Sequence, residues 1–81
     1  MRAGELLEIY RRRQAGYEEG RLRYELILYR AVCTLVDVLA QLPGDEEIRI
    51  DDETGEAIFV VAKSGMPLAT LPVDVVQDGR Y

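Results

Sequence analysis

The first half of the chain has the hydrophobic periodicity of an α-helix. At about 100° per residue, apolar positions between residues 6 and 42 fall within roughly 60° of one another, so they form one stripe. The stripe follows nearly alternating steps of four and three, the spacing of a coiled-coil seam. Its members are Leu6, Tyr10, Tyr17, Tyr24, Leu28, Ala31, Leu35 and Leu42. The pattern predicts one long N-terminal helix.

Local signals in "RRRQAGYEEGRLRY", residues 11–24, oppose a continuous helix. Gly16 and Gly20 each cost about 1 kcal/mol in a helix interior. The arginines before Gly16 suit a helix C-terminus, and the two glutamates after it suit the first turn of a new helix. Because this segment has neither a good N-cap nor a proline, we expect one helix, bent at the glycines. Two helices folded back as a hairpin are the alternative.

The second part of this region, "LILYRAVCTLVDVLAQL", is apolar around roughly three quarters of the helix circumference. Its polar positions share one narrow sector with Arg23; they are Arg30, Thr34, Asp37 and Gln41. One short sheet covers only one side of such a helix, so the pattern favours partner helices from a second copy. The predicted interface consists of Tyr10, Tyr17, Tyr24, Leu28, Ala31, Leu35 and Leu42. Alternatively, a helical hairpin closes a monomeric core.

After "LPGD" the period changes to two, which is typical of β-strands. In "EIRID", Ile48 and Ile50 point inward and Arg49 outward. "DETGE" predicts a turn in which Gly55 takes a positive φ, "AIFVVAK" a second strand, and "LATLPVDVV" a third strand with Pro72 at an edge or a break.

The predicted fold class is therefore α+β in a single domain, residues 1–81. A long N-terminal helix, bent or broken near Gly16 to Gly20, occupies a helical region over residues 1–42. A small antiparallel β-hairpin or three-stranded meander follows over residues 46–76. A chain of this length buries only about 60 to 65% of its unfolded surface, so oligomerisation is the expected reinforcement.

Charge is distributed unevenly along the chain, whose net charge is −5. Residues 1–30 carry seven arginines and five glutamates, whereas residues 31–81 carry ten acids against three basic residues. Phosphate repels such a chain at long range, so nucleic-acid binding would be confined to the arginine segment. Glu8 with Arg12 and Glu19 with Arg23 are spaced as i,i+4 pairs, which favours a solvated helix face. The candidate partner-binding residues are Arg11, Arg12, Arg13 and Arg23.

The residues that usually carry chemistry are largely missing. The chain has no histidine, and Cys33, its only cysteine, lies among apolar neighbours without an activating group. The acids in "DDETGE" do not have the spacing of a calcium-binding loop, and no phosphate-binding loop or nucleophilic serine motif occurs. We therefore expect neither catalysis, nor a metal, nor a cofactor.

A lone cysteine suggests a reducing compartment, and we find neither a basic, apolar leader nor a membrane-spanning run. We expect a cytoplasmic protein with no membrane attachment. The composition favours a non-catalytic, self-associating protein–protein interaction module: a small regulator, inhibitor or assembly component, for example a phage accessory protein. Its partners would be itself and another protein. The alternative is a nucleic-acid-binding dimer that presents an arginine-rich helix; an enzyme with an intersubunit active site is disfavoured by the missing histidine.

Overall fold

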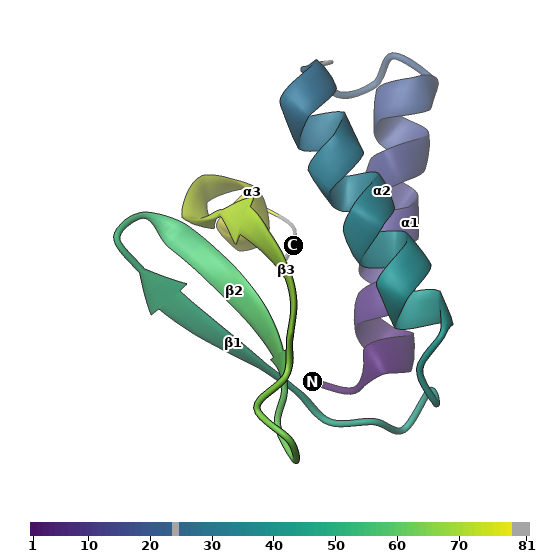
Figure 1. The fold of residues 1–81 in the computed structure, drawn as a ribbon. Coiled ribbons are helices and arrows are strands. Elements are labelled where there is room, and N and C mark those ends of the chain that lie inside the picture. Colours follow the sequence, from purple (N-terminus) through teal and green to yellow (C-terminus); the bar gives the residue numbers. More distant parts are fainter. Residues whose placement is uncertain (24, 79–81) are drawn as a thin grey trace.

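A computed structural model describes residues 1–23 and 25–78 and has an α+β architecture (Figure 1). Two helices lie side by side, and a three-stranded sheet faces them. The elements are α1 (Ala3–Glu18), α2 (Leu26–Ala40), β1 (Ile48–Glu53), β2 (Glu56–Val61), β3 (Pro67–Pro72) and α3 (Val73–Asp78). The predicted fold class and the order of helices before strands are confirmed.

The favoured prediction of one N-terminal helix bent at the glycines is wrong, because α1 ends at Glu18 and α2 begins only at Leu26. The structure instead has the break that the sequence left open near Gly16 to Gly20. Gly20 adopts a φ of 77°, in the left-handed region. The N–H of Arg21 donates to the carbonyl oxygen of Gly16 (2.9 Å), and the N–H of Gly20 donates to that of Tyr17 (3.3 Å). These two bonds form a Schellman motif, which satisfies the last carbonyls of a helix and redirects the chain. Gly20 therefore terminates α1.

Gly16 has a different task, since it allows the connection after α1 to pass close to the helix. A Cβ atom at this position would lie 2.8 Å from Cδ1 of Leu22, closer than van der Waals contact permits. The returning chain is also tied to α1 by the hydroxyl of Tyr29, which donates a 2.6 Å hydrogen bond to Glu18. The result is a helical hairpin, the alternative that the sequence left open.

Most of the wide apolar arc of α2, beyond its first turn, is covered within the chain itself. α1 packs on one side of α2 and β3 on another, so that Val32, Leu35, Val36 and Leu39 are all buried. The polar sector is exposed as predicted; it consists of Arg30, Thr34, Asp37 and Gln41. The arc therefore does not require helices from a second chain.

The sheet has the order β1-β2-β3 and is antiparallel throughout. In β1, Ile48 is buried and Arg49 is exposed, as the alternation predicts. The β1–β2 turn has positive φ at both central residues, 46° at Thr54 and 83° at Gly55. Positive φ at both positions is the feature of a type I′ hairpin turn, and the prediction for Gly55 is confirmed.

The third strand is shorter than predicted, because the chain turns into α3 directly after Pro72. The predicted break at this proline is confirmed, but residues 73–76 are helical and not extended. The neighbouring side chains of Val75 and Val76 are both buried, which a strand with one face on the core does not achieve. Strand alternation was therefore the wrong interpretation of "VDVV".

The hydrophobic core lies between the helical hairpin and the sheet. At its centre the rings of Tyr10 from α1 and Phe59 from β2 meet edge to face, with centroids 5.5 Å apart. Such contacts add about 0.5 to 1.5 kcal/mol to the effect of area burial. None of the helices formed by the described residues is long and apolar enough to cross a lipid bilayer.

Candidate functional site

Most residues of the predicted interface lie in, or against, the core of a single chain. Tyr10, Tyr17 and Leu35 have at most 4% of their surface exposed, and Leu28, Ala31 and Leu42 pack partly buried against the same cluster. Tyr24 lies outside the described residues. Self-association stays a prediction, and in this fold it has to use side chains that the core leaves exposed.

The predicted partner-binding arginines have separate surroundings. Arg12 forms the expected ion pair with Glu8. Arg13 is half-buried; its Nε donates to the hydroxyl of Tyr17 (3.0 Å), and its guanidinium lies 5.6 Å from the centre of that ring. Arg11 is exposed on the outer side of α1. These three residues therefore do not form one cationic face.

Arg23 is exposed in the connection between α1 and α2. Its predicted i,i+4 pair with Glu19 does not form; instead Glu19 accepts from Nε of Arg21 at 2.8 Å. The reason is that residues 19–23 lie beyond the end of α1, where helical spacing no longer brings i and i+4 together.

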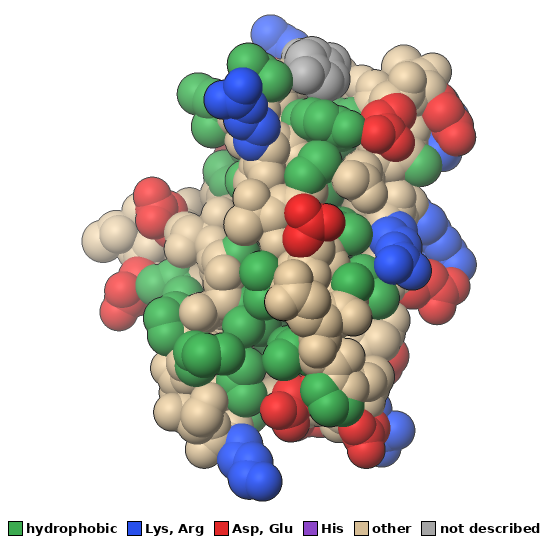
Figure 2. Space-filling view, turned by 45° about the vertical axis from the view of Figure 1, so that its right-hand side comes forward, with side chains coloured by type: hydrophobic (Ala, Val, Ile, Leu, Met, Phe, Trp, Pro, Cys, Tyr) green, Lys and Arg blue, Asp and Glu red, His purple; other side chains and the backbone are tan. Residues whose placement is uncertain are grey.

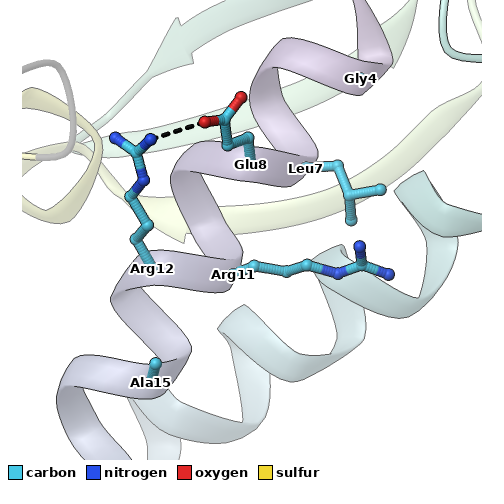
Figure 3. Close-up of a pocket in the computed structure, with 6 residues that line it drawn as sticks. All are labelled: Gly4, Leu7, Glu8, Arg11, Arg12 and Ala15. Atoms are coloured by element: carbon cyan, nitrogen blue, oxygen red, sulfur yellow. Dashed lines mark hydrogen bonds and ion pairs between the residues drawn. The ribbon is translucent and has the colours of Figure 1, made fainter.

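A shallow groove of about 360 Å³ runs along the outer side of α1 (Figure 3). The small residues Gly4 and Ala15 mark its ends, and Leu7 lies between them. Figure 3 shows Arg12 turned back onto Glu8, whereas the side chain of Arg11 extends in another direction, past Leu7. One leucine offers little apolar surface, so this groove is a weak binding site.

A second hollow, of about 530 Å³, lies where the start of α2 meets the sheet. Ile27 and Ala31 line it from the helix, and Gly55, Glu56 and Leu71 line it from the strands. Ile27 is 83% exposed and the preceding Leu26 is 49% exposed. Among the predicted interface residues, Ala31 lies here. Large apolar side chains beside a hollow are typical of protein-binding surfaces.

Charges of opposite sign flank this hollow. Arg30 lies one helical turn from Ile27 on the same side of α2, while Glu53 and Glu56 flank the β1–β2 turn on the other side. None of the three charged side chains forms an ion pair with any residue in the described part of the chain. Leu26, Ile27, Arg30, Glu53 and Glu56 are called the Ile27 surface below.

Figure 2 shows how charged side chains lie around apolar ones on one face of the molecule. Hydrophobic and basic side chains are neighbours at the upper left, at the end of the molecule that carries the helix connection. Acidic side chains project lower down along the left border, on the side of the sheet. Charged side chains of both signs therefore border the apolar surface on this face.

Several polar side chains elsewhere are engaged within the fold. Cys33 accepts a 3.2 Å hydrogen bond from Nε2 of Gln14, across the interface of α1 and α2. The hydrogen bond to Glu18 raises the pKa of Tyr29, and the neighbouring Cys33 and partial burial act in the same direction. Asp51 accepts two hydrogen bonds from Arg49, and these, with its negative charge, raise the pKa of that guanidinium.

Metal-ligand geometry is not found in the part of the chain that the structure describes: no three cysteine, aspartate or glutamate side chains come together there. Comparisons with models of protein families, with curated proteins and with solved structures found no match to this chain. Its function is therefore inferred from the geometry.

Sequence reasoning missed Ile27 as a surface residue, although the helical wheel contains the signal. Ile27 lies four residues after Arg23 and three before Arg30, at the border of the sector that holds the polar residues of α2. An apolar residue at the border of a polar sector is exposed if the members of that sector are exposed. The hollow beside it involves Gly55 and Leu71, which are distant in sequence and give no such signal.

Proposed function

We propose that this chain is a non-catalytic protein-interaction module that self-associates through the Ile27 surface. The observation that carries the proposal is the 83% exposure of Ile27 beside a hollow of about 530 Å³. Burial of an isoleucine side chain stabilises an assembly by about 1.5 to 3 kcal/mol, whereas its exposure to water contributes nothing to the fold. An aromatic or aliphatic side chain from a partner fits the hollow next to it.

The arrangement of charge supports a second copy as the partner. In a two-fold symmetric dimer the same surface of both copies forms the interface, and the rotation sets opposite sides of that surface against each other. Such a contact is favourable when one side is basic and the other acidic. The charges of the Ile27 surface suit this arrangement: Arg30 lies on α2 one turn after Ile27 and does not line the hollow, whereas Glu56 lines it from the sheet and Glu53 precedes the β1–β2 turn. Rotation about an axis near Ile27 brings Arg30 of each copy toward Glu53 and Glu56 of the other.

The nucleic-acid alternative receives less support from the positions of the arginines. Arg12 is neutralised by Glu8, and Arg13 is engaged by Tyr17. A nucleic-acid-binding helix gathers unpaired cations along the line of the phosphates. A gel shift with DNA or RNA at physiological salt tests this alternative; binding tighter than about 1 μM, beyond typical non-specific affinity, would favour it.

The proposed association is tested by sedimentation equilibrium of the wild type and of Ile27→Ser. Because Ile27 is exposed in the single chain, we expect the melting temperature of the dilute variant to change little. The dimer dissociation constant is expected to rise by about tenfold or more. Met66→Ser is the matched control: Met66 is 52% exposed but lies in the β2–β3 turn, away from the Ile27 surface.

Three results count against the proposal. A folded wild-type monomer at high micromolar concentration excludes the association. An unchanged dissociation constant for Ile27→Ser places the interface elsewhere. An equal effect of Met66→Ser shows that exposed apolar area in general, and not this surface, controls association.

A further inference from the structure

The outer side of β1 is paired along only part of its length. The N–H of Ile48 donates to the carbonyl oxygen of Met1 (2.8 Å), and the carbonyl of Ile48 accepts from the amino group of Met1 (3.1 Å). The carbonyl of Glu47 instead accepts from Ala62, on the β2 side. The side of a strand to which the backbone N–H and C=O groups point alternates from one residue to the next. Those of Ile50 and Asp52 therefore point to the same side as those of Ile48.

No strand occupies that side of Ile50 and Asp52 within residues 1–23 and 25–78, where the pairing with Met1–Ala3 stops at Ile48. Figure 1 shows β1 as the outer strand of the sheet. These two residues are called the open edge below. A row of backbone donors and acceptors of this kind is a template for one more strand.

The charge around the open edge is strongly acidic. Between residues 45 and 56 the chain carries seven carboxylates and one basic residue, Arg49. Arg49 is already neutralised by Asp51, through hydrogen bonds of 2.8 and 3.2 Å. Asp52 and Glu53 are exposed and form no ion pair with a described residue. The surface therefore attracts cationic groups and repels acidic ones.

A hollow of about 550 Å³ adjoins the open edge. Met1, Ile50 and Ala62 line it with apolar atoms, and Glu47 and Arg49 lie beside them. Met1 is 47% exposed. A strand that pairs with Ile50 passes this hollow, and a side chain of that strand can enter it. Strand-addition sites combine these two features, backbone pairing for affinity and a side-chain pocket for specificity.

From these observations we infer that the open edge of β1 binds an extended, basic segment of another protein, which adds a fourth strand to the sheet. The backbone groups of Ile50 and Asp52 pair with the segment, the acidic side chains attract its lysines or arginines, and the hollow takes one apolar side chain. The backbone groups of the open edge lie outside the Ile27 surface, although Glu53 borders both, and the site brings in a second kind of partner.

A second copy of β1 does not satisfy the same requirements. Antiparallel pairing that sets residues 51–53 against themselves brings carboxylates face to face, which is unfavourable. A register centred on Ile50 avoids this contact between carboxylates. It would need the outward-facing backbone N–H and C=O of Ile48, which are already hydrogen-bonded to Met1. The acidic edge therefore discriminates against its own copy and in favour of a basic strand.

The inference is tested with a labelled peptide of alternating lysine and valine, by fluorescence anisotropy at physiological salt. Two control peptides separate the contributions. One replaces lysine by glutamate, and the other keeps lysine but carries N-methyl groups along one edge of its backbone. Because strand addition requires both charge and backbone hydrogen bonds, we expect each control to bind at least about tenfold more weakly.

Two protein variants locate the site. Asp52→Asn removes the charge and keeps the backbone N–H, whereas Asp52→Pro removes both. A proline is tolerated on an edge strand where the N–H faces outward, so the ladder between β1 and β2 is preserved. We expect Asp52→Pro to bind the lysine peptide about tenfold more weakly than Asp52→Asn does. Ile27→Ser is expected to bind it like the wild type.

Several outcomes overturn the inference. Failure of the lysine peptide to bind at millimolar concentration does so directly. Equal binding of the N-methylated peptide reveals attraction between charges without strand addition. Equal affinities of the Asp52→Asn and Asp52→Pro proteins place the peptide on another edge. If Asp52→Pro unfolds, the two control peptides still decide the matter on the wild type.

Discussion

At the scale of single residues, the two central positions of the β1–β2 turn suit their backbone to different degrees. Gly55 takes a φ of 83° without cost, because it has no Cβ. Thr54 takes a φ of 46° with a branched Cβ, which disfavours the left-handed region. Asparagine is the residue that most often accompanies glycine in such a turn. The hairpin therefore carries local strain at Thr54.

The first prediction is that Thr54→Asn stabilises the protein by about 0.5 to 1 kcal/mol, because it relieves this strain. Gly55→Val is expected to destabilise it by about 1 to 3 kcal/mol, since valine is poorly compatible with a positive φ. Glu53→Gln, at an exposed position in the same hairpin, serves as the control with a change within about 0.5 kcal/mol. Urea denaturation measures all three variants. A less stable Thr54→Asn protein contradicts the argument.

The second prediction concerns Gly16, where packing and not φ is limiting. Gly16→Val places a branched side chain where a Cβ alone would lie 2.8 Å from Leu22, and we expect a loss of about 1 to 3 kcal/mol. The double variant Gly16→Val, Leu22→Ala removes the obstructing side chain. We expect it to be less destabilised than the sum of the two single variants. Additive losses would mean that Leu22 is not the obstacle.

At the scale of elements, a polar contact between α1 and α2 near their connection helps to hold the helical hairpin together. The hydroxyl of Tyr29 donates to Glu18 at 2.6 Å, and the rings of Tyr29 and Tyr17 meet edge to face with centroids 6.2 Å apart. The hydrogen bond exists only while Tyr29 is protonated. Protonation of this side chain is therefore linked to helix pairing.

The third prediction follows from the raised pKa of Tyr29, whose largest cause is the hydrogen bond to Glu18. A raised pKa in the folded state means that the contribution to stability is complete below the ordinary tyrosine value of about 10 and is lost as pH rises through the higher folded value. An NMR titration of the Tyr29 ring should show ionisation above that ordinary value. Glu18→Gln should lower the pKa of Tyr29; an unchanged titration would assign the shift to other neighbours.

The sequence predicted the elements whose signals are local. The alternation around Ile48 and the glycine at position 55 specify the β1–β2 hairpin, and the polar sector from Arg30 to Gln41 specifies the exposed side of α2. The break between the helices was only the alternative prediction, for a geometric reason. Seven residues, 19 to 25, separate α1 from α2, which is close to the roughly 7.2 residues of two helical turns. The apolar stripe therefore keeps its phase across a connection that is not helical.

The candidate site was less predictable than the fold. Exposure of Ile27 follows from its place among polar residues on the helical wheel, whereas the hollow beside it depends on the docking of α2 onto β3. The open edge of β1 likewise depends on where the pairing with Met1 stops. Both features result from contacts between residues that are far apart in sequence, and no periodicity reports on these.

At the scale of the whole molecule, the fourth prediction concerns Arg30 and Glu56, the opposite charges of the Ile27 surface in the proposed dimer. Arg30→Glu and Glu56→Arg each bring like charges together across a two-fold interface, and each should weaken association by about tenfold. The double variant exchanges the two charges and should recover much of the affinity. Sedimentation equilibrium at low and high salt measures the three variants.

Lys63→Glu provides the control for net charge, because it changes the total charge as much as Arg30→Glu does. Lys63 is exposed in the connection between β2 and β3, away from the β1–β2 turn. Weakening by Lys63→Glu to the same degree would indicate a general effect of charge. A double variant no better than the single ones would show that Arg30 and Glu56 do not meet.

The strand pairing of Met1–Ala3 with residues 46–48 also bears on the order of folding events. α1 with α2 and β1 with β2 each join neighbours in the chain, and such local contacts form quickly. The pairing of Met1 with Ile48 closes a loop of more than forty residues and depends on both halves. We expect it to form late. In pulse-labelled hydrogen exchange, the amide of Ile48, which faces Met1, should become protected after that of Arg49, which faces β2; simultaneous protection would mean that both halves assemble in one step.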